Sequence, residues 1–135
     1  MQDFSDVAPF LQTCGDLDVF LKEHGFRQVE DLSPKWRRTR ECSRLDYSSE
    51  IWVRCFGKSY QAVRIDWKGH PTNPPYFHGH GPHFHLEMFP FEDFGLYLEG
   101  ATRLNGSPIA IRRFDTRTGE DTTDFKATHG PLKPV

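Results

Sequence analysis

Strict alternation of apolar and polar residues in two segments constrains the fold of this chain more than any other feature. Apolar residues occupy the odd positions of residues 63–68 and the even positions of residues 83–88. Successive side chains of a β-strand point to opposite faces of a sheet, whereas a helix repeats about every 3.6 residues. We therefore predict two strands, each with one apolar face and one polar face.

The rest of the chain indicates one short helix and further strands. Apolar residues recur at helical spacing between Asp16, a typical N-cap residue, and Gly25, which predicts a helix over residues 15–25. Residues 51–56 alternate and are joined to residues 60–68 by a Gly-Lys turn, which predicts a β-hairpin. Two more strands are predicted, over residues 94–98 and 109–116.

The chain of 135 residues fits a single α+β domain. Its predicted parts are an acidic helical segment over residues 1–31, a mostly antiparallel sheet of five to six strands over residues 32–117, and a polar tail over residues 118–135. Within the sheet region, residues 69–82 are rich in His, Pro and Gly and are predicted to be a loop, because proline lacks the N–H that regular pairing needs. The tail is expected to be a loop or a lightly docked end.

Several features of the sequence bear on the compartment in which the protein works. No apolar run approaches the roughly 20 residues that span a bilayer, and the N-terminal residues show no signal peptide. The three cysteines are widely spaced and form no C-x-x-C pair, which is typical of buried free thiols in a reducing compartment. We therefore expect a cytoplasmic protein with no membrane partner.

Charge is distributed unevenly along the chain, although the net charge is only −2. Residues 1–31 carry two basic and seven acidic side chains, while residues 32–70 carry nine basic and four acidic ones. A basic segment with interleaved aromatic residues suits contact with a phosphate backbone, so Arg38 and Arg54 are candidate substrate-binding residues. A solvated strand face is the alternative explanation.

The polar faces of the two alternating segments hold the candidate catalytic residues. If these strands are neighbours, one sheet face carries two imidazoles, two carboxylates and two cations, from Arg64, Asp66, Lys68, His83, His85 and Glu87. Histidine titrates near neutrality, so one imidazole can take a proton from a ribose 2′-hydroxyl while a second imidazole, or Lys68, returns one to the leaving 5′-oxygen. A carboxylate would hold an imidazole in the right tautomer. Arg64, Arg112 or Arg113 would neutralise charge on the phosphoryl oxygens.

The same histidines allow two other interpretations. A His-x-His pair on a strand places both rings on one side, so His83 and His85, together with His78, His80 or Glu87, can supply three or four ligands to Zn²⁺ or a similar ion. This alternative describes a metal-binding β-rich domain, either enzyme or sensor. The other describes a solvated sheet face in a non-catalytic interaction module.

These residues resemble a known family. Arg64-Ile65-Asp66, followed by Gly79-His80-Gly81-Pro82-His83-Phe84-His85-Leu86-Glu87, is similar to the R-(I/F)-D … G-x-P-H-x-H-x-E pattern of C-terminal toxin domains of bacterial polymorphic toxins. The toxins are of the Rhs and contact-dependent inhibition type, and the match covers about residues 63–87. The resemblance implies a small α+β ribonuclease that reaches a rival's cytoplasm as part of a larger secreted protein and is neutralised by a cognate immunity protein.

The resemblance also points to specific residues, namely His83, His85 and Glu87, with Arg64 and Asp66 on the neighbouring strand. We therefore expect an endoribonuclease that cleaves RNA without a metal cofactor. A weaker similarity, to the His-x-His metal strand of cupins, supports the alternative of a zinc- or iron-binding domain, although the spacing to Glu92 and Gly100 departs from that of cupins.

Overall fold

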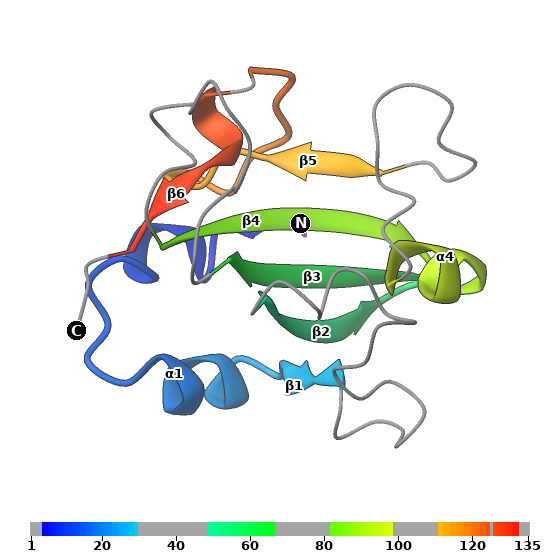
Figure 1. Ribbon diagram of the computed structural model, residues 1–135, viewed down its shortest axis with the longest axis horizontal. Coiled ribbons are helices and arrows are strands. Elements are labelled where there is room, and N and C mark those ends of the chain that lie inside the picture. Colours follow the sequence, from blue (N-terminus) through cyan, green and yellow to red (C-terminus); the bar gives the residue numbers. More distant parts are fainter. Residues whose placement is uncertain (1–3, 30–48, 67–81, 99–110, 125, 133–135) are drawn as a thin grey trace.

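The computed structural model describes residues 4–29, 49–66, 82–98, 111–124 and 126–132, and these form an α+β fold around an antiparallel sheet. The main path of the sheet has the order β1-β2-β3-β4-β5, and β6 pairs with β4 beside β5 (Figure 1). The strands span Arg27–Gln28 (β1), Ser49–Phe56 (β2), Ser59–Asp66 (β3), His83–Pro90 (β4), Arg112–Phe114 (β5) and Gly130–Pro131 (β6). The predicted fold class is confirmed.

The predicted helix is present as α1, Leu17–Glu23. The Asp16 carboxylate caps it by accepting a hydrogen bond from the Val19 backbone N–H at 3.1 Å. Gly25 follows the helix with a φ of 86°, a left-handed conformation that favours glycine at this position. A 3₁₀ turn, η1 (Ala8–Phe10), precedes α1.

The predicted hairpin is confirmed, with β2 and β3 joined through Gly57 at a φ of 60°. Strand β4 pairs antiparallel with β3, so that Arg64 lies opposite His85 and Asp66 lies opposite His83. Residues opposite each other in paired strands point to the same face. The two polar faces predicted from the alternation therefore form one continuous face.

The sheet is buried on both faces. On one face, the N-terminal residues and α1 cover a core built from Phe4, Val7, Ala8, Leu11, Leu21, Phe26, Trp52, Val63, Ile65, Phe84, Leu86, Met88 and Phe114. On the other, a second core contains Val29, Ile51, Val53, Ala62, Phe89, Tyr97 and Leu98. Ile51 of this second core lies opposite Arg64, so the polar residues share their face with apolar neighbours. The alternative of a solvated polar face is therefore wrong, because every residue of β4 up to Phe89 is buried.

One predicted strand is a helix. After the 3₁₀ turn η4, Phe91–Asp93, the chain forms α4, Phe94–Leu98, at the far end of β4 from β6 (Figure 1). The apolar residues Phe94, Tyr97 and Leu98 follow an i, i+3, i+4 spacing, which suits a helix packed on the second core.

The last predicted strand and the tail also differ from expectation. Strand β5 is shorter than the predicted strand over residues 109–116, part of which lies outside the described residues. The tail is not lightly docked: it forms the 3₁₀ turn η5, Lys126–Thr128, and β6, and His129 is buried between them.

Two further findings concern the surface. No helix in the described parts of the chain is long and apolar enough to cross a membrane. Cys14 is partly exposed and Cys55 is exposed, so the expectation of buried thiols is wrong for both, although both thiols are free. Cys42 lies outside the described residues.

Candidate functional site

A buried polar cluster lies where β3, β4 and the segment before β6 meet. The register of β3 and β4 brings together Arg64, Asp66, His83, His85 and Glu87. The side chains expose little surface: His83 is 1% exposed and Glu87 is 2% exposed. These are the residues that the toxin resemblance selects, and the structure places them in one group.

Asp66 is the carboxylate shared by both strand histidines. Its Oδ2 lies 3.3 Å from Nε2 of His83 and 3.4 Å from Nε2 of His85, while its Oδ1 lies 3.4 Å from Nε of Arg64. Burial alone would raise the pKa of Asp66, but the Arg64 guanidinium and the contacts with the two histidine rings hold that pKa well below its usual range. Asp66 is therefore ionised at neutral pH and can orient both rings.

Glu87 anchors the other side of Arg64. Its Oε1 lies 3.3 Å from a terminal nitrogen of Arg64 and accepts a hydrogen bond from the Tyr97 hydroxyl at 2.7 Å. Burial would lower the pKa of Arg64, but the Glu87 and Asp66 carboxylates outweigh it and raise that pKa. The guanidinium thus remains a fixed positive charge inside the protein. Tyr97 comes from α4, the segment whose sequence we interpreted as a strand.

His85 is held in its neutral form. Burial is the main cause, and the nearby Arg64 charge adds to it, which lowers the pKa of His85 to about 3. At neutral pH its ring is therefore uncharged and keeps a lone pair.

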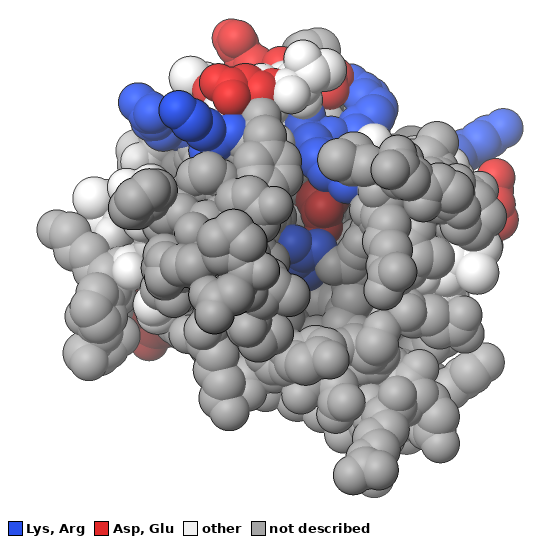
Figure 2. All heavy atoms as spheres, turned by 45° about the horizontal axis from the view of Figure 1, so that its top comes forward, with Lys and Arg blue, Asp and Glu red and all other residues white. Residues whose placement is uncertain are grey.

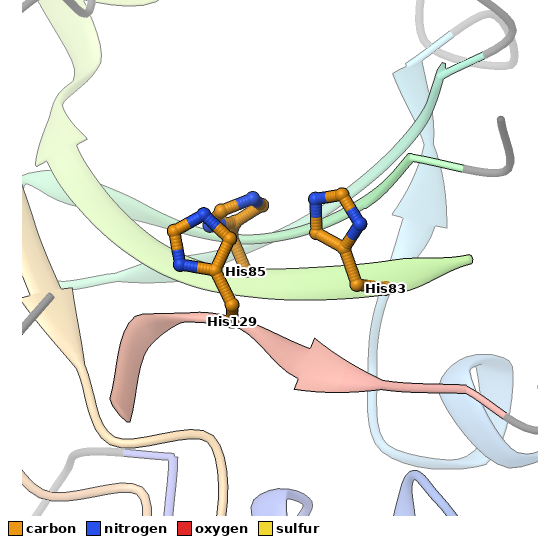
Figure 3. Close-up of side chains that lie close together, drawn as sticks. All are labelled: His83, His85 and His129. Atoms are coloured by element: carbon orange, nitrogen blue, oxygen red, sulfur yellow. The ribbon is translucent and has the colours of Figure 1, made fainter. Parts of the chain in front are cut away.

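The tail adds a third imidazole, that of His129. From the sequence, we expected the tail to be a polar loop or a lightly docked end. Continuing the β4–β6 register by one residue puts His129 opposite His85, on the same face. The ring centroids of His129 lie 4.4 Å from His85 and 5.4 Å from His83, and the three rings gather above β4 in Figure 3. The Thr128 hydroxyl hydrogen-bonds Nδ1 of His129 at 3.1 Å. Because β6 spans two residues, no periodicity in the sequence marks it.

The arginines predicted to bind substrate lie in different places. Arg113 is opposite Glu87 on the face of the cluster and is partly exposed. Arg54 lies on the opposite face, where its terminal nitrogens contact the Asp6 carboxylate at 2.7 and 2.8 Å and its guanidinium stacks on Phe26. Arg54 is thus a structural residue of the N-terminal layer and does not belong to the cluster.

Arg112 also points away from the cluster, because it alternates with Arg113 along β5, and it pairs with Asp121. Of the remaining predicted site residues, Arg38, Lys68, His78 and His80 lie outside the described residues. On the side of the molecule that carries β5 and β6, acidic and basic side chains meet in a recess (Figure 2). Of the three described arginines that were predicted to bind substrate, Arg113 alone lies on the face of the histidines, where it could meet an approaching anion.

Comparison of the chain with family models, with curated proteins and with solved structures found no match. The chemistry that the cluster can perform is therefore inferred from its side chains. It combines imidazoles, a carboxylate that orients two of them, and a fixed guanidinium charge. Such a set can transfer protons and stabilise developing negative charge.

Proposed function

We propose that this protein is a toxin-type endoribonuclease that cleaves RNA by metal-independent acid–base catalysis in the buried polar cluster. The observation that supports this proposal is the β3–β4 register, which gathers all five residues of the toxin-like motif, Arg64, Asp66, His83, His85 and Glu87, around one point. The choice of RNA as substrate rests on the resemblance of the motif, and so does a cognate immunity protein as partner.

The reaction needs a base, an acid and a positive charge. Neutral His85 takes the proton of a ribose 2′-hydroxyl, whose oxygen then bonds to phosphorus. The bond from phosphorus to the 5′-oxygen breaks, and His129, in its protonated form, gives that oxygen a proton. The products are a 2′,3′-cyclic phosphate and a 5′-hydroxyl. Arg64 and Arg113 would stabilise the added negative charge on the phosphoryl oxygens.

Asp66 and Glu87 act as positioning residues in this scheme. Asp66 holds His83 and His85, and Glu87, itself held by Tyr97, fixes the guanidinium of Arg64. Groups held by their neighbours in this way lose little freedom when substrate binds.

The test is cleavage of labelled RNA in excess EDTA. We expect fragments that end in 2′,3′-cyclic phosphate, and a loss of rate of roughly 10²–10⁴-fold in His85→Ala and in His129→Ala. His24→Gln is the matched control, because it removes an imidazole that contacts Phe20 on α1 and leaves the cluster intact. Absence of cleavage by the wild-type protein at every salt concentration would refute the proposal.

A further inference from the structure

Polar atoms of the cluster lie close enough together to be candidate ligands of one metal ion. Candidate ligand atoms of His83, His85 and His129 all lie within 4.8 Å of one another. In a tetrahedral zinc site with bonds of about 2.0–2.1 Å, neighbouring ligand atoms are about 3.3–3.5 Å apart. Oδ2 of Asp66 lies at 3.3 and 3.4 Å from the two strand histidines, longer than a charge-assisted hydrogen bond of about 2.8 Å. The three histidines are therefore a candidate ligand set, and Asp66 lies at ligand spacing from two of them.

The surroundings of these atoms also suit a cation. Zinc-binding histidines usually hydrogen-bond through their second ring nitrogen. The Thr128 hydroxyl hydrogen-bonds Nδ1 of His129 in this way, so a metal would bind His129 through Nε2. The carboxylates of Asp66 and Glu87 both pair with Arg64, and the negative charge of Asp66 beside the two strand histidines would attract a dication.

We propose that His83, His85, His129 and Asp66 bind one Zn²⁺ ion and that this ion inhibits the ribonuclease. The inhibition rests on the proposed function, whereas the metal site does not. Zn²⁺ would bind through the three imidazoles. On His83 and His85 the ion would then take the place of the proton on the nitrogen that faces Asp66, so Asp66 could no longer orient the two rings for proton transfer. Neither His78 nor His80 is needed for this ligand set.

The small exposure of the cluster favours an ion over a polynucleotide in this conformation. The side chains of His83, His85 and Asp66 are 1%, 7% and 10% exposed. An ion needs only the space between the ligand atoms, whereas a phosphodiester must reach them from outside. Zinc would thus stabilise this arrangement of the side chains and compete with RNA by mass action.

Binding is measured on metal-free protein, prepared with EDTA and then freed of chelator, by competition with a chromophoric zinc indicator. We expect one Zn²⁺ per chain and an increase in melting temperature. With Co²⁺ in place of zinc, the absorption bands of tetrahedral cobalt should appear. Loss of a group that only orients a metal ligand costs about 10–100-fold in metal affinity, and loss of a ligand should cost at least as much. We therefore expect His129→Ala to lower the zinc affinity by more than about 100-fold and Asp66→Asn to lower it by at least about 10-fold. His24→Gln should bind like the wild type.

The activity arm adds Zn²⁺ to the metal-free enzyme with labelled RNA. Inhibition whose midpoint follows the measured dissociation constant supports the proposal. Absence of stoichiometric binding, binding that survives in His129→Ala, or activity that rises with zinc would overturn it. Zinc binding by a protein that never cleaves RNA would keep the metal site but remove both the proposed function and the inhibition. If His129→Ala does not fold, His129→Gln, which keeps a polar side chain but no imidazole, replaces it.

Discussion

The close contact of β6 with the sheet makes Gly130→Ala a direct test of how the tail delivers His129. A Cβ atom at Gly130 would lie 2.5 Å from two carbons of the Phe84 ring and 2.8 Å from Cβ of Thr116. Carbon atoms in good contact are about 3.5–4.0 Å apart, so β6 would have to move by about 1 Å or more. Phe84 cannot give way cheaply, because it is buried in the core beneath α1.

This displacement should have two measurable consequences. Overpacking of a buried site costs about 1–3 kcal/mol, which we expect as the loss in the free energy of unfolding. Because a misplacement of about 1 Å can cost about 10²-fold in rate, ribonuclease activity should fall by that order. The β3–β4 part of the cluster should persist, since its register does not involve β6.

Urea unfolding and RNA cleavage in EDTA measure both effects on the same preparation. Gly15→Ala is the matched control: it adds the same methyl group where no atom lies within 4 Å, so it should change neither quantity. If Gly130→Ala is as stable and as active as Gly15→Ala, then β6 does not lie on Phe84 and the placement of His129 is wrong.

Three further predictions concern the charges. Arg64→Met should lower the free energy of unfolding by about 3–5 kcal/mol in urea titrations, because it leaves the buried Glu87 carboxylate without its cation. Tyr97→Phe should cost about 1.5–3 kcal/mol in the same assay, through loss of the hydrogen bond to Glu87. The hydrogen bond with Arg54 lowers the pKa of Asp6, so this ion pair stabilises the fold above the unfolded-state pKa of about 3.9 and loses that contribution as the pH falls further. At pH 7 the free energy of unfolding of the wild type should exceed that of Asp6→Asn by no more than about 1 kcal/mol, because the side chain of Asp6 is 46% exposed. This difference should shrink below about pH 4.

Alternation predicted which side chains of β3 and β4 would share a face if the strands were neighbours, and the structure supplies the pairing. A period of two assigns each residue to a face, and the antiparallel register then sets Arg64 opposite His85 and Asp66 opposite His83. The helix α1 was equally predictable, because its cap and its glycine are local signals. These features depend on neighbours in the sequence or on a single strand pairing.

The remaining features depend on tertiary contacts that leave no periodic signal. Strand β6 is held by only two paired residues and by backbone hydrogen bonds such as Leu132 N–H to the Pro82 carbonyl at 2.9 Å. Nothing in the sequence therefore distinguishes His129 from a solvated tail residue. The burial of the polar face likewise depends on Tyr97 and Leu98, whose helix spans only five residues and is too short for a clear helical period.

The position of the cluster inside the second core is itself an argument for function. Taking Arg64, Asp66 and Glu87 out of water costs several kcal/mol per ion, and apolar residues of similar size at such positions are often as stable or more stable. The same face already packs Ile51, Ala62 and Tyr97, so an apolar continuation would fit the fold. Buried groups with strongly shifted pKa values, here the neutral His85 beside the ionised Asp66, concentrate at catalytic and metal-binding sites. The burial of these charged residues is therefore in keeping with the proposed proton transfer and zinc binding, and stability alone does not account for it.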